Sequence, residues 1–361
     1  MLIPLQFNPV FKNKIWGGRA LEKVLGKSLP ENIAIGESWE ISGLKDCESV
    51  SITQPYYGKK ISEILSENKQ DLLGIYTRYE EFPLLYKFID AKQKLSVQVH
   101  PDDAWVCANE LGFFGKNECW YIVDAKNDSK IICGLKKGIT RKILEKAIIS
   151  NKIEEVLNFV DVSPGDVIFI PARTIHAVLG GILFYELQQS SDITFRLYDW
   201  NRLDNNKVAR KLHIEEALNI LDTTFNNYYK IPPVIFEETS SYIHFFRIAC
   251  RYFALEEYKF LKDSEINLPV KRSFRVITVL SNNVKLLFDN SSINLLKGST
   301  TLIPACVTGL KAIASSGTHF LLSYVPDLLT EVVAPLSVKK IPRENIVLLG
   351  GNPATSDLGI F

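Results

Sequence analysis

The chain has 361 residues, of which 46% are hydrophobic and 11% aromatic, so it can bury one large core or two smaller ones. Its 42 basic and 41 acidic residues give a net charge of +1, which excludes a strong overall field for binding nucleic acid or an anionic membrane. Six scattered cysteines without a CxxC pair indicate free thiols, and no secretory signal or membrane-length apolar run is visible. A cytoplasmic location is therefore expected.

Short β-strands separated by turns dominate the first half of the chain, because segments rich in β-branched and aromatic residues alternate with Gly, Pro and Asp. In chain order, the expected strands of this half are 37–41, 81–91, 94–100, 118–125, 129–135, 165–171, 182–189 and 192–200. The helical patterns are fewer, at 61–73, 102–111, 140–158 and 213–221. Many strands with few helices predict a β-sandwich or barrel and not a doubly wound sheet.

The second half continues the β pattern after a segment that contains a Pro-Pro pair and a polar cluster. Residues 225–240 are interpreted as a linker, and the later expected strands are 245–255, 274–280, 284–289 and 318–325. We therefore expect a first domain at 1–238 with a short helical insert at about 139–160, and a smaller β domain at 239–325. The tail, 326–361, contains the loop-like GGNPATSDLG and has no assigned role.

Four polar residues in the first half form a candidate metal site. Gln98 and His100 stand two residues apart in LSVQVHPDD, so both side chains leave one face of a strand that Pro101 ends. Glu118 begins the next strand, and His176 follows the segment PGDVIFIP. Each residue alone is most simply structural, but together they offer two imidazoles, one carboxylate and one amide oxygen, which suit zinc or a similar divalent ion. One ligand charge leaves the ion near +1, as suits a Lewis acid.

The motifs around these residues resemble those of a known enzyme family. The pattern PGDxxxIPxxxxHA resembles the second metal-binding motif of cupins, which are jelly-roll β-sandwiches. More narrowly, six ordered segments resemble the signatures of class I mannose-6-phosphate isomerases in their compact bacterial form. These segments are KIWGG, IGESWEIS, FPLLYKFIDAKQKLSVQVHPDD, KNECWYIV, SPGDVIFIPARTIHAV and ELQQSSDITFRLYDWNR. The resemblance covers residues 5 to about 220, and past 240 only the general β pattern matches.

The resemblance implies a cupin-type jelly-roll and a zinc-dependent activity, and the strand pattern past residue 240 adds a second, smaller β domain. A zinc enzyme of this family interconverts mannose 6-phosphate and fructose 6-phosphate by proton transfer through a metal-stabilised enediolate. The family's metal ligands correspond to Gln98, His100, Glu118 and His176, all four of which match in residue type. The expected partner is a small sugar phosphate, without nucleic acid or membrane.

The resemblance assigns two candidate catalytic residues, and the position of Lys116 in the sequence adds a third. Arg196 corresponds to the arginine usually assigned as catalytic, and because it stays protonated we interpret it as an electrostatic stabiliser or substrate orienter. Asp192 shares its strand parity and is a candidate for proton transfer. Lys116 lies two residues before Glu118, so it shares the ligand's face; a neighbouring divalent cation disfavours the ammonium form, which makes a neutral lysine base reasonable. The general base therefore remains open between Lys116, Asp192 and metal-bound water.

Substrate contacts are expected from Lys116, Arg196, Lys87 and Ser96. Lys87 interrupts the apolar strand PLLYKFI and needs an anionic partner, for which a sugar phosphate is suitable. Two alternatives stay open: a metal cupin of another kind, such as a non-haem iron oxygenase with two histidines and a carboxylate, and a sugar-phosphate-binding cupin without catalysis. Against the oxygenase, Gln98 would fill a coordination position. The metal used in the cell, the breadth of aldose specificity and the oligomeric state are not determined by the sequence.

Overall fold

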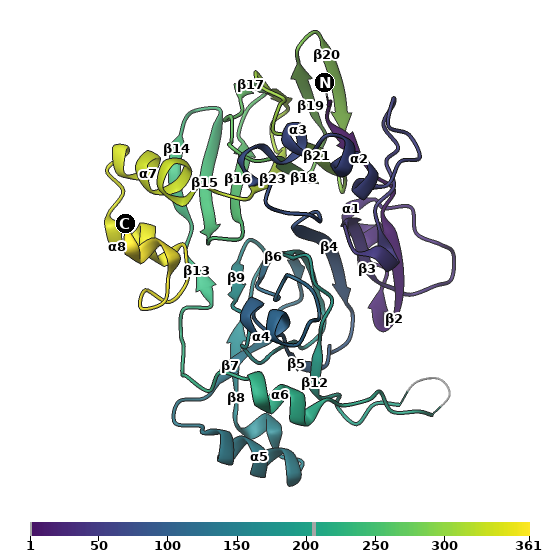
Figure 1. Cartoon of the computed structure of the whole chain (residues 1–361), viewed down its shortest axis with the longest axis vertical. Helices are drawn as coiled ribbons and strands as arrows, with labels where there is room; N and C mark the ends of the chain where they lie inside the picture. Colours follow the sequence, from purple (N-terminus) through teal and green to yellow (C-terminus); the bar gives the residue numbers. More distant parts are fainter. Residues whose placement is uncertain (1, 204–206) are drawn as a thin grey trace.

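The computed structural model describes residues 2–203 and 207–361, which are mainly β. The described strands form four antiparallel sheets, and Figure 1 shows these as two sandwiches, the first below and the second above. In the first sandwich, a seven-stranded long sheet faces a five-stranded short sheet, which is the jelly-roll arrangement expected from the sequence.

Eight strands of the first sandwich lie in the expected segments, and four others, β2, β8, β10 and β13, were not expected. In sheet order, the long sheet contains β13 (Lys230–Ile231), β9 (Val167–Ile170), β6 (Glu118–Ala125), β11 (Ile182–Gln189), β4 (Leu84–Ala91), β3 (Ile35–Ile41) and β2 (Val10–Gly18). The short sheet contains β12 (Phe195–Tyr198), β5 (Val97–Val99), β10 (His176–Val178), β7 (Lys130–Leu135) and β8 (Leu157–Asp161). Side chains from both sheets form a closed apolar layer between them, including Trp120, Ile131, Cys133, Val178 and Phe184.

The helices of this half are shorter than the sequence predicts. They are α1 (Ala20–Leu25), α2 (Ile61–Glu67), α3 (Lys69–Leu73), α4 (Asp103–Ala108), α5 (Arg141–Ile149) and α6 (Ile214–Ile220). The helix expected over 61–73 is interrupted at Asn68, which leaves helical geometry with φ −138°. The helix expected over 140–158 is wrong beyond Ile149, because Asn151 adopts a left-handed conformation with φ 56°. Residues 157–158 instead begin strand β8.

The second sandwich contains strands from two parts of the chain, β1 near the N-terminus and a continuous run of strands from residue 234 onwards. Its larger sheet contains β1 (Leu5–Gln6), β21 (Thr300–Ile303), β18 (Arg275–Ser281), β23 (His319–Tyr324), β16 (Ala254–Phe260), β15 (Tyr242–Ala249) and β14 (Val234–Glu238). Its smaller sheet contains β17 (Ser264–Asn267), β22 (Lys311–Ala314), β19 (Val284–Phe288) and β20 (Ser291–Leu295). The range expected at 1–238 therefore includes two strands, β1 and β14, that pair with the second sandwich.

Two further expectations for this half are corrected. Residues 225–240 are not only a linker, because β13 and β14 both lie within them. The segment 245–255 is not one strand, because β15 and β16 meet there at a turn that Cys250 closes with a backbone hydrogen bond to Phe253. The apolar alternation continues through this turn, so strand pattern alone did not reveal it.

The C-terminal tail is helical over much of its length. A π-helical turn at Leu329–Val333 leads into α7 (Ala334–Val338), and α8 (Arg343–Leu348) follows. Figure 1 shows α7 and α8 beside β14. The expected loop at 350–359 holds only until Asp357, where a short 3₁₀ turn begins. Among residues 2–203 and 207–361, the structure contains no helix that is long and apolar enough to cross a membrane.

A large apolar core joins the two sandwiches. The outer face of the long sheet contributes Phe88, Cys119, Tyr121, Tyr185 and Leu187, and the second sandwich packs against them through the same core. Full burial of side chains of this size stabilises the fold by about 1.5–3 kcal/mol each. Strand β6 therefore has two different faces: one packs against the second sandwich, and the other carries Glu118 and Trp120 towards the interior of the first.

Candidate metal centre

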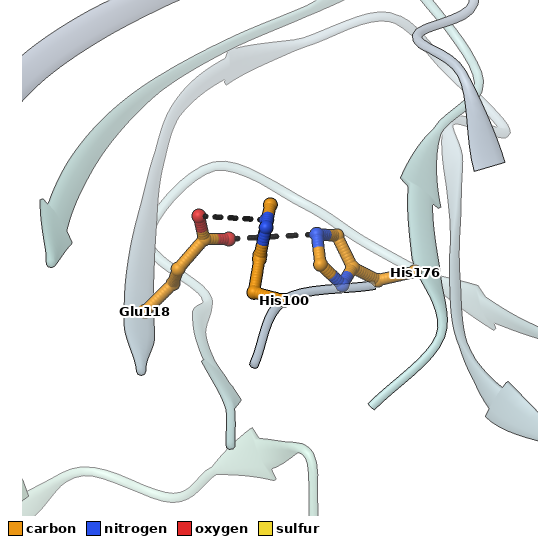
Figure 2. A group of neighbouring side chains, drawn as sticks. All are labelled: His100, Glu118 and His176. Carbon is orange, nitrogen blue, oxygen red and sulfur yellow. Dashed lines mark ion pairs between the residues drawn. The ribbon is translucent and has the colours of Figure 1, made fainter. Parts of the chain in front are cut away.

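Three ligating side chains converge between the two sheets of the first sandwich. His100, Glu118 and His176 are fully buried, and their ligand atoms all lie within 4.8 Å of one another. Figure 2 shows the Glu118 carboxylate facing both imidazole rings. The structure thus brings together three of the four side chains for which the sequence predicts metal binding, and the fourth, Gln98, lies beside His176.

Strand register places these groups. Gln98 on β5 is the direct partner of His176 on β10, and on its other side Gln98 is the partner of Arg196 on β12. Directly paired residues point to the same face of an antiparallel sheet, so these three side chains leave the short sheet side by side. Glu118 comes from the opposite sheet, where it is the first residue of β6.

The Glu118 carboxylate has charged neighbours but no well-directed hydrogen bond. Its Oε1 lies 2.7 Å from Lys116 Nζ and 3.3 Å from His100 Nε2, and its Oε2 lies 3.6 Å from His176 Nε2. Neither oxygen accepts a hydrogen bond of good geometry, although both are buried. Buried carboxylates are normally satisfied by hydrogen bonds, so this arrangement suits a group that binds a cation.

A backbone carbonyl oxygen orients each imidazole through its Nδ1 atom. His100 Nδ1 lies 2.8 Å from the Ile193 carbonyl oxygen, and His176 Nδ1 lies 2.8 Å from the Thr174 carbonyl oxygen. Because a carbonyl can only accept, each Nδ1–H must donate, so the Nε2 of each ring carries the lone pair and faces the centre. There Lys116 Nζ lies 3.2 Å from His100 Nε2, and Gln98 Nε2 lies 3.4 Å from His176 Nε2. Metal-ligating histidines use this arrangement in proteins. The donor set therefore fits a divalent metal ion, and a metal cofactor is assigned to this centre.

The surroundings of the three ligands shift their pKa values towards the protonation states that bind a cation. Burial lowers the pKa of His176 to about 3, although Glu118 opposes this shift. Burial and the nearby Lys116 cation also lower the pKa of His100. Burial opposes the charged form of Glu118, but Lys116 and the imidazoles outweigh it and hold its pKa well below the ordinary value. Near neutral pH the imidazoles are thus unprotonated and the carboxylate is charged, the states that a metal requires.

A cavity of about 220 Å³ opens beside this centre. The sequence-predicted residues that line it are Lys87, Ser96, Gln98, Lys116, His176, Asp192 and Arg196. His100 and Glu118 lie behind this wall. All nine side chains predicted for the site are therefore in the wall or directly behind it.

The floor of the cavity is a polar row across the long sheet. Lys87, Glu186 and Trp120 are direct partners across β4, β11 and β6. Lys87 Nζ lies 3.1 Å from Glu186 Oε2 and donates to Gln188 Oε1 at 2.8 Å. Burial opposes the charge on Lys87, yet Glu186 and the nearby Glu37 raise its pKa above the ordinary value. The partner that Lys87 needs is therefore first of all Glu186.

Sequence reasoning missed several residues of this cavity. Glu186, Glu37, Lys14 and Arg210 line it and were not singled out. Glu186 carries a signal that could have identified it, because it interrupts the apolar strand ILFYELQQ as Lys87 interrupts PLLYKFI. Lys14 and Arg210 carry no such local signal, because they lie in segments of ordinary mixed polarity.

Arg196 and Asp192 reach the cavity in different ways. Arg196 lies on β12, donates from Nη1 to the Lys211 carbonyl oxygen at 3.0 Å, and has a buried Nε without a hydrogen-bond partner. Asp192 precedes β12, which begins only at Phe195, so the expected shared strand parity of Asp192 and Arg196 is wrong. Asp192 is exposed on the rim and also borders a neighbouring cavity of about 500 Å³.

The chain is similar to known mannose-6-phosphate isomerases in sequence. The family model "Phosphomannose isomerase type I, catalytic domain" matches residues 4–111. A putative mannose-6-phosphate isomerase of Bacillus subtilis is 36% identical over 306 residues, covering 84% of this chain and 93% of the relative. A second mannose-6-phosphate isomerase of the same organism is 35% identical over 304 residues, covering 83% of this chain and 93% of the relative. Alignments of this length extend well past residue 220, where the recognised motifs end.

The solved structures agree with the sequence matches. The crystal structure of a mannose 6-phosphate isomerase from Bacillus subtilis superimposes with a TM-score of 0.82 and 32% identity, covering 90% of this chain and all of that one. A putative mannosephosphate isomerase from Archaeoglobus fulgidus has a TM-score of 0.70 and 19% identity over 90% of this chain, which shows a shared fold.

Proposed function

We propose, because the chain belongs to the mannose-6-phosphate isomerase family, that it interconverts mannose 6-phosphate and fructose 6-phosphate. The observation that carries this proposal is the unsatisfied Glu118 carboxylate, held between two oriented imidazoles at the end of a cation-rich cavity. An aldose–ketose isomerase needs a group that stabilises negative charge on two neighbouring oxygens, a base for one proton, and a holder for the remote phosphate.

The proposed cofactor is one zinc ion, with Gln98, His100, Glu118 and His176 as its ligands. Two imidazole nitrogens and one carboxylate are ligands that zinc accepts, and the amide oxygen completes a set that leaves room for substrate. When bound, the ion supplies charge stabilisation to the O1 and O2 atoms of the sugar.

Proton transfer is proposed to use Lys116, with Asp192 as the candidate for the hydroxyl protons. In the direction of fructose 6-phosphate, the base removes the C2 proton of the open-chain aldose, and the C1=O bond electrons move to O1. The resulting enediolate collects its proton at C1 from the same base, while a second proton moves between O1 and O2. Lys116 lines the cavity, and its Nζ lies 2.7 Å from the buried Glu118 carboxylate. It would therefore lie close to the O1 and O2 atoms of a sugar bound at this centre.

Arg196 is proposed to stabilise the enediolate and to orient the substrate. Its guanidinium stays protonated, and its buried Nε has no partner of its own, so it can donate to a substrate oxygen. Cations outnumber carboxylates on the cavity wall, where Lys14 and Arg210 join the predicted Lys87, Lys116 and Arg196. This excess favours a dianionic phosphate, to which the Ser96 hydroxyl is a further candidate donor.

Turnover in deuterated water tests the proposal. Zinc-loaded protein should convert mannose 6-phosphate to fructose 6-phosphate and incorporate deuterium at C1 or C2, and a chelator should abolish both reactions until zinc is restored. Glucose 6-phosphate, which differs in configuration at C2, serves as the comparison substrate. Zinc-loaded protein that binds mannose 6-phosphate without conversion or exchange would exclude the isomerase.

A further inference from the structure

Asn117, the residue between Lys116 and Glu118, is hydrogen-bonded by each of its polar groups. Its backbone N–H and its side-chain Nδ2 both donate to Gln189 Oε1, at 3.0 and 2.7 Å. Its carbonyl oxygen accepts from the Gln189 backbone N–H at 3.2 Å, and its Oδ1 accepts from the Ala172 N–H at 2.9 Å. The segment that carries Lys116 and Glu118 is therefore fixed by a neighbour that points away from the cavity.

Gln189 connects the hydrogen bonds of Asn117 to the second sandwich. Its Nε2 donates to Asp103 Oδ1 at 2.9 Å, and the same oxygen accepts from the Gly115 backbone N–H at 2.7 Å. The other oxygen of Asp103 accepts from the Tyr252 hydroxyl at 2.8 Å. Gln189 is almost fully buried, with 1% of its surface exposed, and Tyr252 lies in the turn between β15 and β16. A continuous chain of hydrogen bonds thus leads from this turn to the metal centre.

Backbone contacts connect the same chain to the histidine ligands. The Lys116 N–H donates to the Pro101 carbonyl oxygen at 2.9 Å, directly after His100. The His100 carbonyl oxygen accepts from the Arg173 N–H at 2.7 Å, in the loop that precedes His176. The three segments that carry His100, Glu118 and His176 are therefore tied to one another around Asn117.

We propose that Gln189 is a positioning residue that sets the spacing of Glu118 and Lys116 relative to the histidines, and that Tyr252 supports it through Asp103. The inference deepens the proposed function, because it concerns the same centre. Gln189 fits this role since its one amide joins two different segments: the oxygen holds Asn117 and the nitrogen holds Asp103. Replacing a group that hydrogen-bonds a metal ligand directly lowers metal affinity by about 10–100-fold. Gln189 acts one step further out, through Asn117, so its effect should lie near the lower end of this range.

Gln189→Met tests the proposal, because it keeps the side-chain length and removes both hydrogen-bonding arms. We expect its zinc dissociation constant, measured by competition with a chromophoric chelator, to rise about 10-fold. Tyr252→Phe removes only the outermost hydroxyl and should raise the constant by a smaller factor. It also serves as the second variant if Gln189→Met does not fold.

The matched control is Thr278→Val, which removes a buried Thr278–Thr300 hydroxyl pair at 3.2 Å within the second sandwich. It should lower the thermal midpoint of the zinc-free protein without changing the zinc dissociation constant. Zinc affinity of Gln189→Met within twofold of wild type, with an unchanged kcat at saturating zinc, would overturn the proposal. If wild-type protein binds zinc but does not convert mannose 6-phosphate, the proposed function fails, while the ratio of zinc affinities still decides this inference.

Discussion

Each sandwich contains a buried glutamate beside a histidine and a lysine, and the two glutamates differ in how their oxygens are satisfied. In the second sandwich, Glu256 Oε1 accepts from Lys271 Nζ and from the Tyr324 hydroxyl, both at 2.7 Å. Its Oε2 lies 2.8 Å from His244 Nε2. In the first sandwich, neither oxygen of Glu118 accepts a well-directed hydrogen bond.

This difference separates a structural group from a functional one. The donors around Glu256 outweigh the effect of burial and lower its pKa to about 2, so its charge is fully compensated within the protein. Glu118 also has a neighbouring cation, Lys116, but neither of its buried oxygens accepts a well-directed hydrogen bond. A sequence motif with Glu, His and Lys is thus compatible with either role, and the hydrogen-bond geometry distinguishes them.

The largest effect is expected from Glu118→Gln. The change removes the negative ligand, so zinc binding should be lost and kcat/KM should fall by at least about 10³, more than for a single electrostatic donor. The zinc-free variant should also unfold at a lower denaturant concentration than wild type, because the buried Lys116 ammonium loses its ion-pair partner. Chelator competition, steady-state kinetics and urea unfolding measure the three quantities. Full activity of the variant would show that the metal is bound elsewhere.

A somewhat smaller loss is expected from Lys116→Arg, which keeps a cation beside Glu118 but removes the proposed base. General base catalysis contributes about 10²–10⁴ in rate, so kcat should fall within that range. The rise of activity with pH that comes from deprotonation of the base should disappear. A near-wild-type kcat with an unchanged pH profile would move the base to Asp192 or to metal-bound water.

Arg196→Ala should lower kcat and kcat/KM together by about 10²–10³, with little change in KM, if Arg196 donates to charge that develops in the transition state. Steady-state kinetics on mannose 6-phosphate decide the point. A raised KM with nearly unchanged kcat would instead assign Arg196 to holding the phosphate.

Glu256→Gln should differ from Glu118→Gln by leaving zinc binding and activity intact. Breaking a buried ion pair costs about 3–5 kcal/mol, so the free energy of unfolding should fall by that amount at pH 7 because Lys271 loses its partner. The kcat of the folded variant should stay near wild type. Urea unfolding and kinetics at a temperature where both proteins are folded measure this.

The same pair predicts a pH dependence of stability. The folded-state pKa of Glu256, about 2, lies below the ordinary value of 4.5, so its stabilisation is present above pH 4.5 and is lost as pH falls towards 2. The difference in unfolding free energy between wild type and Glu256→Gln should therefore narrow between pH 4.5 and 2. A constant difference over this interval would contradict the compensation of Glu256.

Local patterns in the sequence predicted the parts of the site that lie on single strands. Period-two alternation placed Gln98 and His100 on one face, and a turn–strand–turn motif located His176. The sandwich class followed from the number of short strands, and the structure confirms it.

The remaining features depend on pairing between distant strands. Glu186 belongs to the site because β11 pairs with β4 in the register that sets it against Lys87. Gln189 holds Asn117 through the corresponding pairing of β11 with β6, a contact that no local period encodes. The early end of α5 depends on the left-handed Asn151, where a polar residue continued an otherwise helical pattern.

A crystal structure of the zinc-loaded protein, with anomalous diffraction at the zinc edge, tests the central contrast between the two sandwiches most directly. The account predicts one zinc ion about 2.0–2.2 Å from His100, Glu118 and His176, with Gln98 beside it. It also predicts that Glu256 keeps its contacts with Lys271, Tyr324 and His244. Zinc bound at Glu256 and His244, or the four predicted ligands pointing apart around an empty cavity, would contradict it.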